Sequence, residues 1–283
     1  MNKTCIIIAG PTAVGKTAIS IEVAEHFSTE IISADSRQCY KELNIGVAKP
    51  SPEELAEIHH YFINSHSIQD NFSAADYEQY ALAAVDDIFK KNDLAVMVGG
   101  TGLYLKAFCE GLDEIPAVDE SIRQEIIKNY DEHTIEWLQQ KVKETDPLFY
   151  SAGEIQNPHR LIRALEVKLS TGKSIISFQT KQKKVRNFKI IKIGLQLPRE
   201  ILYERINTRV DNMMAMGLAD EVKNLIPFKH LNALQTVGYK ELFDYFSGGS
   251  SALSLEKTIE LIKQNTRHYA KRQVTWFKKE EGM

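Results

Sequence analysis

The sequence that decides the fold runs from residue 4 to residue 17, where the apolar run Thr4–Ala9 continues directly into Gly10-Pro11-Thr12-Ala13-Val14-Gly15-Lys16-Thr17. The second part matches Gly-x4-Gly-Lys-Ser/Thr in full, which is the pattern of a phosphate-binding loop, or P-loop. Its two glycines allow backbone amides to turn towards phosphate oxygens, and a helix beginning near Lys16 presents its positive end to them. Lys16 would neutralise the terminal phosphate, and Thr17 would offer its hydroxyl to Mg²⁺. The alternative, an ordinary strand–turn–helix junction, gives no reason for Lys and Thr at these positions.

Strand and helix patterns alternate through the first third of the chain. Short apolar or β-branched runs predict strands, and apolar residues at helical spacing predict helices. We expect strands at Thr4–Ala9, Glu30–Ala34, His60–Ile63 and Leu94–Val98, and helices at Lys16–Phe27, Ala74–Lys91 (capped by Ser73) and Thr101–Glu110. This alternation is typical of α/β proteins, in which a parallel sheet carries helices on both faces. Together with the P-loop it predicts a P-loop NTPase-like core.

The pattern changes after Pro116. Asp119–Thr171 has helical periodicity and no convincing strand, so we interpret residues 116–187 as a helical insertion into a core domain formed by residues 1–115 and 188–283. The alternating residues of Phe188–Leu197 predict the strand that returns the chain to the sheet. Helices are expected after this strand at Arg199–Met216, Ala219–Ile226, Ala233–Phe246 and Leu255–Lys279.

The charges are unevenly distributed along the chain. The net charge is only −3, but the segment from Arg160 to Lys192 holds ten Lys or Arg and a single acid, Glu166. That segment therefore carries +9, while the rest of the chain has 25 Lys or Arg against 37 Asp or Glu and carries −12. Such segregation favours a polyanion-binding face on an otherwise acidic protein. A solvated basic loop around Lys181-Gln182-Lys183-Lys184 explains the charge equally well.

Composition also limits the compartment in which the protein works. No apolar run reaches the roughly 18 residues that span a bilayer, so we expect no membrane association. The N-terminal apolar run follows one basic residue and leads straight into the P-loop, as a buried strand does and a signal peptide does not. The three cysteines, Cys5, Cys39 and Cys109, are far apart and lack Cys-x-x-Cys spacing, which argues against a disulfide framework or a zinc site. These features predict a cytoplasmic protein.

Two further segments follow predicted strands and should meet the P-loop at the carboxyl edge of the sheet. They are Asp35–Gln38 and Gly99–Thr101. A carboxylate at Asp35, across from a bound phosphate, would be placed to accept a proton from a nucleophile. From position alone, a turn Asp at a strand end is an equally good interpretation. P-loop hydrolases usually end an apolar strand with an Asp that helps to hold the metal, whereas Leu94–Val98 ends in glycines, which favours transfer to a bound acceptor over hydrolysis.

Several further motifs are specific to one family. Besides the P-loop, they are Asp35-Ser36-Arg37-Gln38-Cys39-Tyr40, Asn44–Pro50, His59-His60, Phe72–Tyr77, Gly99–Tyr104, Arg160–Val167, Val237-Gly238-Tyr239 and Ala270–Phe277. In these motifs the chain resembles, nearly end to end, the tRNA dimethylallyltransferases, also called tRNA isopentenyltransferases. It lacks the cysteines of the zinc-finger extension found in eukaryotic members, so it resembles the bacterial type.

The resemblance implies transfer of a dimethylallyl group from dimethylallyl diphosphate to the exocyclic N6 amine of the adenosine next to the anticodon, with release of diphosphate. It implies Mg²⁺ as cofactor, bound at Thr17, and Asp35 as the general base, with Thr101 and Lys16 as further catalytic residues. The diphosphate would lie in the P-loop, Gly10 to Thr17, together with Arg209. An exposed helix arginine is the alternative for Arg209, since Arg205 lies one turn away on the same face.

The implied partner is tRNA, bound through its anticodon stem-loop by a monomer. An adenine in an RNA loop must be splayed into a pocket before it can react. Family positions that contact tRNA match Asp35, Ser36, Arg37, Gln38 and Thr101 in the core, and Arg123, His159, Arg160, Leu161, Ile162 and Arg163 in the insertion. The second group includes the start of the basic segment, so charge and resemblance indicate the same surface. For Arg123 alone, a solvated helix residue is the default interpretation.

Three other functions share part of this evidence. A small-molecule kinase would use the same P-loop with ATP, and Arg205 and Arg209 would be available over the triphosphate. A prenyltransferase acting on free adenine nucleotides would share the chemistry but would not need the basic insertion. An RNA-binding module with a relic P-loop is disfavoured by the intact Lys16, Thr17 and Asp35.

Overall fold

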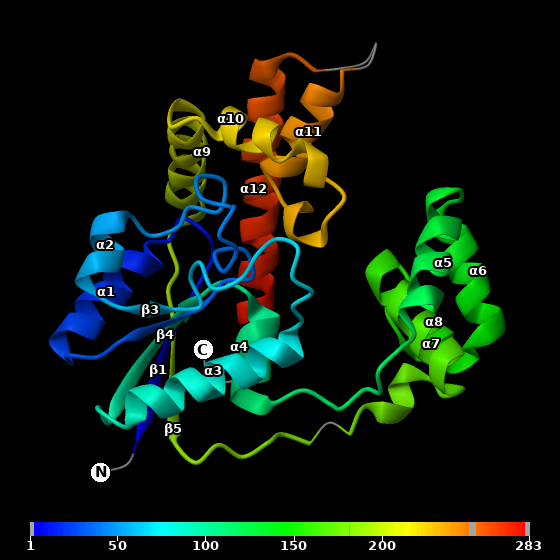
Figure 1. Ribbon diagram of the computed structural model, residues 1–283, viewed down its shortest axis with the longest axis horizontal. Coiled ribbons are helices and arrows are strands. Elements are labelled where there is room, and N and C mark those ends of the chain that lie inside the picture. Colours follow the sequence, from blue (N-terminus) through cyan, green and yellow to red (C-terminus); the bar gives the residue numbers. More distant parts are fainter. Residues whose placement is uncertain (1–2, 181, 249–252, 281–283) are drawn as a thin grey trace. The chain divides into compact units, whose positions relative to one another are not determined.

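The computed structural model describes residues 3–180, 182–248 and 253–280. They form two compact units: unit 1 takes the chain up to Glu110 and from Val185 onward, and unit 2 is Gly111–Lys184. Figure 1 shows the elements of both units. The sequence placed the insertion at residues 116–187, so each boundary lies a few residues earlier in the structure. Each unit is described below by itself.

Unit 1 is built on a sheet of five parallel strands, which are β1 (Thr4–Ala9), β2 (Ile31–Ala34), β3 (His60–Tyr61), β4 (Leu94–Gly99) and β5 (Lys189–Gly194). Their order in the sheet is β3-β2-β4-β1-β5. Gly99 pairs with both Ala9 and Ala34, so β1, β4 and β2 end side by side. The predicted α/β class and its P-loop NTPase-like parallel sheet are confirmed.

Alternate residues of the central strands enter two separate cores, because successive side chains of a strand point to opposite faces. On one face Ile6 and Ile8 pack with α1 (Lys16–His26). On the other face Ile7 packs with α3 (Ala74–Phe89) and α4 (Gly102–Glu110). Burial on both faces explains why the first strand is a nearly continuous apolar run.

The helices after β5 complete unit 1, and one of them differs from expectation. They are α9 (Arg199–Ala215), α10 (Leu218–Asn224), α11 (Tyr239–Ser247) and α12 (Leu255–Phe277). The predicted helix Ala233–Phe246 is wrong, because it is divided into a short 3₁₀ turn at Asn232–Leu234 and α11. The physical reason is Gly238, whose φ of 93° is outside the helical range and sets the N-terminus of α11.

Side-chain caps define the N-termini of two helices of unit 1. The predicted cap at Ser73 is confirmed, since its side chain accepts a hydrogen bond from the amide of Asp76. A further helix, α2 (Pro52–Glu57), was not predicted. Its capping box of Ser51 and Glu54, with Pro52 in the first turn, is legible in the sequence, but six residues are too few to show helical periodicity.

Unit 2 is entirely helical, with α5 (Glu120–Asp131), α6 (Ile135–Thr145), α7 (Pro147–Ala152), α8 (Pro158–Thr171) and the 3₁₀ turn η1 (Ile175–Phe178). It has a core of its own, in which Leu138, Val142, Leu161 and Leu165 are fully buried.

Among the described residues, every helix of the chain is too short or too polar to cross a bilayer.

Candidate active site

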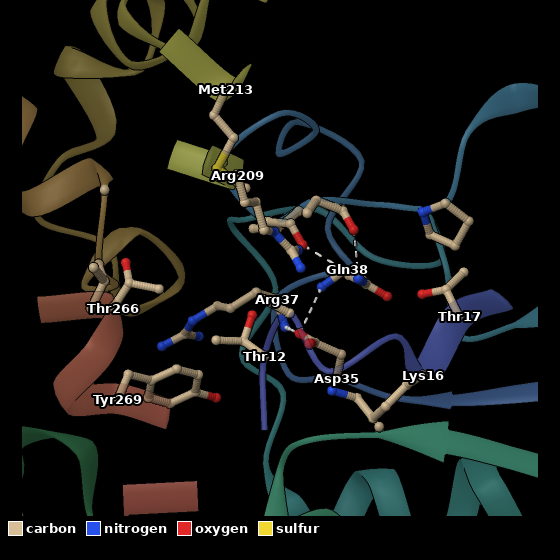
Figure 2. Close-up of a pocket in the computed structure, with 18 of the residues that line it drawn as sticks. Thr12, Lys16, Thr17, Asp35, Arg37, Gln38, Arg209, Met213, Thr266 and Tyr269 are labelled. Atoms are coloured by element: carbon tan, nitrogen blue, oxygen red, sulfur yellow. Dashed lines mark hydrogen bonds between the residues drawn. The ribbon is translucent and has the colours of Figure 1, made fainter. Parts of the chain in front are cut away.

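A cavity of about 500 Å³ lies in unit 1, where β1, β2 and β4 end. Its walls come from the P-loop, the segment after β2, the loop at residues 46–50, and helices α9 and α12. Figure 2 shows its central side chains, which include Thr12, Lys16, Thr17, Asp35, Arg37, Gln38, Arg209, Met213, Thr266 and Tyr269. The structure therefore brings together, in one unit, residues that are far apart in the sequence.

The P-loop is formed by small residues in unusual conformations. A Cβ atom at Gly10 would lie 2.7 Å from the carbonyl oxygen of Leu195, so only glycine fits there. Ala13 and Gly15 both have left-handed backbones, with φ of 65° and 102°. Gly15 is the N-cap of α1, and Lys16 and Thr17 in the first turn of α1 line the cavity. The cavity thus receives the free amides and the positive end of the helix, which favour an anion.

Lys16 folds back onto the P-loop. Its Nζ donates hydrogen bonds to the carbonyl oxygens of Gly10 (3.0 Å) and Pro11 (2.8 Å). Burial lowers the pKa of Lys16 from 10.5 to about 8; the negative charge of Asp35 opposes this change, and the positive charge of Arg209 adds to it. The ammonium group is therefore desolvated and has neutral acceptors only, a state that a bound anion would relieve.

Asp35 follows directly after β2 and reconciles the two interpretations that its position left open. Its Oδ1 accepts hydrogen bonds from the amides of Arg37 (2.9 Å) and Gln38 (3.3 Å), as a turn Asp does. The same carboxylate lines the cavity, and Figure 2 shows it beside Lys16. Its Oδ2 accepts no hydrogen bond from the described residues. One oxygen thus holds the turn while the other is available to a ligand.

Thr101 lies behind Asp35 and not in the cavity wall. Its Oγ1 accepts a hydrogen bond from the amide of Ser36 (3.1 Å) and lies 3.4 Å from the hydroxyl of Ser36. Its own amide donates to the carbonyl oxygen of Ala34 (3.2 Å). The side chain thus ties the end of β4 to the turn that carries Asp35.

Gln38 has a fixed orientation. Its Nε2 donates to the carbonyl oxygens of Val47 (3.3 Å) and Ala48 (3.0 Å), which uses both amide hydrogens. Only its Oε1 remains for a ligand, apart from a long contact of 3.5 Å with the hydroxyl of Ser33. Gln38 can therefore accept a hydrogen bond from a base but cannot donate one in this conformation.

Arg209 reaches the cavity from α9 (Figure 2). It forms no ion pair within the described part of the chain, and burial lowers its pKa, an effect that the charge of Asp35 opposes. Arg205, one turn earlier, is exposed and also lines the cavity. Arg209 is thus a buried arginine of the cavity wall and not a solvated helix arginine.

Comparison with known proteins agrees with this geometry. The sequence profile described as IPP transferase matches residues 38–280. A tRNA dimethylallyltransferase of Christiangramia forsetii is 52% identical over 280 residues, which are 99% of this chain and 92% of that protein. The tRNA dimethylallyltransferase 1 of Bacteroides thetaiotaomicron is 47% identical over 98% of this chain and 89% of its own length. The chain belongs to the IPP transferase family.

Solved structures of the family have the same fold. The tRNA isopentenylpyrophosphate transferase of Bacillus halodurans aligns with a TM-score of 0.70 and 36% identity, over 99% of this chain and 88% of that one. A eukaryotic dimethylallyltransferase described as acting on tRNA aligns with a TM-score of 0.79 and 28% identity, over 97% of this chain and 69% of that one. The resemblance read from the motifs is confirmed.

In this IPP transferase Gln273 is a buried site residue to which the sequence assigned no role. Its Oε1 accepts a hydrogen bond from the amide of Thr12 (2.9 Å), and its Nε2 donates to the carbonyl oxygen of Gly100 (3.0 Å). Gly100 is required for this contact, because a Cβ there would lie 2.4 Å from the Nε2. The motif at residues 270–277 thus connects α12 to the loops after β1 and β4, which only the tertiary structure reveals.

His60 is a second residue of the cavity wall that the motifs contained but did not explain. It is 7% exposed, and its Nδ1 lies 2.8 Å from the carbonyl oxygen of Ile58. Its Nε2 has no hydrogen-bond partner among the described residues. Burial lowers the pKa of His60, so the ring is neutral and its Nε2 is an acceptor.

The tRNA-contacting positions expected in the insertion divide into two groups. His159 and Arg160 are exposed in the first turn of α8, and Arg123 and Arg163 are partly exposed. Leu161 and Ile162, in contrast, are 0% and 7% exposed and belong to the core of unit 2. Their side chains pack inward, because they lie on the apolar face of α8. The expectation that these two residues contact tRNA stays a prediction, and such a contact would be made by their backbone.

The donor set for a metal ion is sparse. No group of three His, Cys, Asp or Glu side chains that could hold a metal occurs among the described residues. Thr17 lines the cavity beside the P-loop. One hydroxyl is compatible with Mg²⁺, which can take most of its ligands from substrate phosphates and water. Mg²⁺ at Thr17 stays a prediction.

Proposed function

We propose that the chain transfers a dimethylallyl group from dimethylallyl diphosphate to the N6 amine of the adenosine next to the anticodon of tRNA and releases diphosphate. The observation that carries this proposal is the shared cavity, where a carboxylate, Asp35, lies beside an anion-binding P-loop and two desolvated cations, Lys16 and Arg209. The curated relatives that bear the name tRNA dimethylallyltransferase support it.

The chemistry assigns the two parts of the cavity different roles. The bond between the first carbon of the dimethylallyl group and the diphosphate oxygen breaks, and a bond between that carbon and N6 forms. The P-loop amides, Lys16 and Arg209 would stabilise the negative charge that develops on the departing diphosphate. The amine loses a proton, which the free Oδ2 of Asp35 would accept as general base.

Thr17 would hold Mg²⁺ through its hydroxyl, and the ion when bound would help to neutralise the leaving diphosphate. Apolar side chains also line the cavity, among them Met213, Leu218, Val237 and Ile262, and they offer a surface suited to a five-carbon chain. Gln38, limited to accepting a hydrogen bond, would face an amine hydrogen of adenine, whose ring nitrogens offer only acceptors.

The turn that carries Asp35 would bind the target nucleotide, through Ser36, Arg37 and Gln38, with Thr101 fixing its shape. Figure 2 shows Arg37 extending towards Tyr269 of α12, so this side of the cavity combines an aromatic ring with a cation. Unit 2 would bind the anticodon stem-loop through Arg123, His159, Arg160 and Arg163. We propose that a monomer works on tRNA in the cytoplasm.

The test is mass spectrometry of tRNA nucleosides after reaction of unmodified tRNA with dimethylallyl diphosphate and Mg²⁺. Adenosine heavier by one dimethylallyl group is the expected result, formed by the wild-type protein and at a much lower rate by Asp35→Asn. Two parallel reactions examine the alternatives: ATP with nucleosides, for a kinase, and AMP with dimethylallyl diphosphate, for a nucleotide prenyltransferase. Phosphorylated nucleosides, or turnover on AMP equal to that on tRNA, would replace the proposal with one of these functions.

A further inference from the structure

Glu166 is the single acid of the basic segment, and it is fully buried on α8. Two arginines from two helices contact it. Nη1 of Arg123, on α5, lies 2.7 Å from its Oε2, and Nη1 of Arg163, one turn earlier on α8, lies 2.8 Å from its Oε1. Each carboxylate oxygen thus accepts one charge-assisted hydrogen bond. The two arginines, Arg123 and Arg163, are called the arginine pair below, and Glu166 connects them across helices α5 and α8.

The contacts with Glu166 leave part of the charge and several N–H donors of the arginine pair available to a ligand. The side chains of Arg123 and Arg163 are 41% and 37% exposed, while that of Glu166 is not exposed at all. Two positive charges and one negative charge leave a surplus of +1. Each guanidinium has five N–H donors in a planar fork, so donors remain on both residues for a ligand in solvent.

The neighbouring residues extend the same surface. Arg160 lies one turn before Arg163 on α8 and is exposed, and His159 is exposed beside it. Residues three apart on a helix lie on one face. Asn157, the N-cap, accepts hydrogen bonds from the amides of His159 and Arg160. These two amides are therefore already bonded, and a ligand at this surface would be bound by side chains. Cations at this spacing, two of them held by a common carboxylate, suit a chain of phosphates.

We propose that Glu166 is a positioning residue for RNA binding: it holds Arg123 and Arg163 as a preorganised phosphate-binding pair for the backbone of the tRNA substrate. This inference rests on the proposed function and adds to it the residue that orients two of the contacts. A free arginine must be immobilised when it binds a phosphate, whereas these two are already fixed on their inner side.

Replacing Glu166 by its neutral isostere distinguishes a positioning role from a purely electrostatic one, because the two roles predict opposite changes in RNA affinity. Glu166→Gln removes a negative charge next to the binding surface. If the arginines act only through their charge, RNA binding becomes tighter, because the surface is more positive. If Glu166 orients them, binding becomes weaker, because a neutral amide cannot hold two guanidinium groups, which then repel each other.

The experiment measures Kd of a labelled anticodon stem-loop by fluorescence anisotropy at several salt concentrations. For Glu166→Gln we expect binding about tenfold weaker than wild type, with a salt slope reduced by roughly one to two phosphate contacts. Glu125→Gln is the matched control, since Glu125 is an exposed acid on α5 and the charge change is the same. We expect it to bind as wild type or slightly more tightly.

A double-mutant cycle keeps the test informative if the variant is less stable. In an Arg123→Gln, Arg163→Gln background, Glu166→Gln should cause no further loss of RNA affinity, because its partners are absent. The same loss in both backgrounds, or tighter binding of Glu166→Gln alone, would overturn the inference. A thermal melt of each full-length variant records any loss of folding separately.

Turnover separates this inference from the proposed function. With saturating tRNA, Glu166→Gln should keep the wild-type kcat and show a raised KM for tRNA, because Asp35 and the P-loop belong to unit 1. A lowered kcat with unchanged KM would contradict a positioning role in RNA binding. If the wild-type protein makes no dimethylallyl adenosine, the proposed function fails; if it does and Glu166→Gln binds RNA normally, only this inference fails.

Discussion

In unit 1, Lys16 and Arg209 line the cavity without an ion-pair partner in the described part of the chain, whereas in unit 2 Arg123 and Arg163 share the buried carboxylate of Glu166. Burial lowers the pKa of both unit 1 cations. The arginines of unit 2 keep more than a third of their side-chain surface in solvent. The two units therefore prepare positive charge for anions in different ways.

The difference matches two kinds of phosphate. A diphosphate carries several charges on a small group, so its binding can offset the cost of desolvating two cations, which favours such a ligand over one with a single charge. An RNA backbone carries one charge per phosphate and stays hydrated. A half-exposed pair of arginines, partly neutralised and fixed in position, suits that ligand, and exposed contacts are also sensitive to salt.

The largest effect is expected at Asp35, whose carboxylate lines the cavity and forms no ion pair with the described residues. Asp35→Asn retains the turn, because the amide oxygen can accept the same backbone hydrogen bonds, but it cannot take a proton. We expect kcat to fall by about 10²- to 10⁴-fold, the usual contribution of a general base. Single-turnover kinetics with radiolabelled dimethylallyl diphosphate measure this, and tRNA affinity should stay within a few-fold of wild type. Unchanged turnover would remove the assignment of the base.

Lys16 tests whether the unpaired cations of unit 1 serve the diphosphate. Lys16→Ala removes a charge-assisted contact, and we expect binding of inorganic diphosphate and kcat/KM for dimethylallyl diphosphate to weaken together, by about 10- to 100-fold. Titration calorimetry measures the first and initial rates the second. Lys106→Ala, at an exposed residue of α4 outside the cavity wall, is the control and should have no effect. Wild-type diphosphate affinity in Lys16→Ala would contradict the proposed role.

Charge reversal at Arg160 and Arg163 tests whether the exposed arginines of unit 2 bind tRNA. The double variant Arg160→Glu, Arg163→Glu should weaken tRNA binding by about tenfold and lower the salt slope by roughly one to two contacts. Affinity for inorganic diphosphate should not change, since those contacts belong to unit 1. An unchanged salt slope would mean that the basic surface is merely solvated.

The pH dependence of diphosphate binding should be the smallest of these effects. Because the pKa of Lys16 is lowered to about 8, its ammonium group loses its proton as pH rises through 8. Between pH 7 and pH 9, affinity for inorganic diphosphate should fall a few-fold relative to Lys16→Arg, whose guanidinium stays charged. Comparing the two proteins cancels the ionisation of diphosphate itself. A constant ratio across this range would show that Lys16 keeps its proton.

Most of the fold and the centre of the site could be predicted, since their signals are local. The P-loop and the strand before it, the cap at Ser73 and the placement of Asp35 after a strand depend on short stretches of sequence. Leu161 and Ile162 show the limit of such reasoning: a family motif predicts a segment that contacts tRNA, but only the packing of the helix decides which of its side chains face outward. The break at Gly238 was missed because one glycine does not by itself exclude a helix.

By itself the sequence determined the parallel P-loop core, the identity of the family, and the set of charged residues available for catalysis and binding. Only the tertiary structure decided how those residues are partnered: Gln273 on the amide of Thr12, Gln38 with both its hydrogens used, and Glu166 between Arg123 and Arg163. The reason is physical. Hydrogen-bonding patterns within a strand, turn or helix follow from neighbouring residues, whereas the partners of Gln273, Gln38 and Arg123 lie on other segments of the chain. How those segments pack against one another has no local signal in a single sequence.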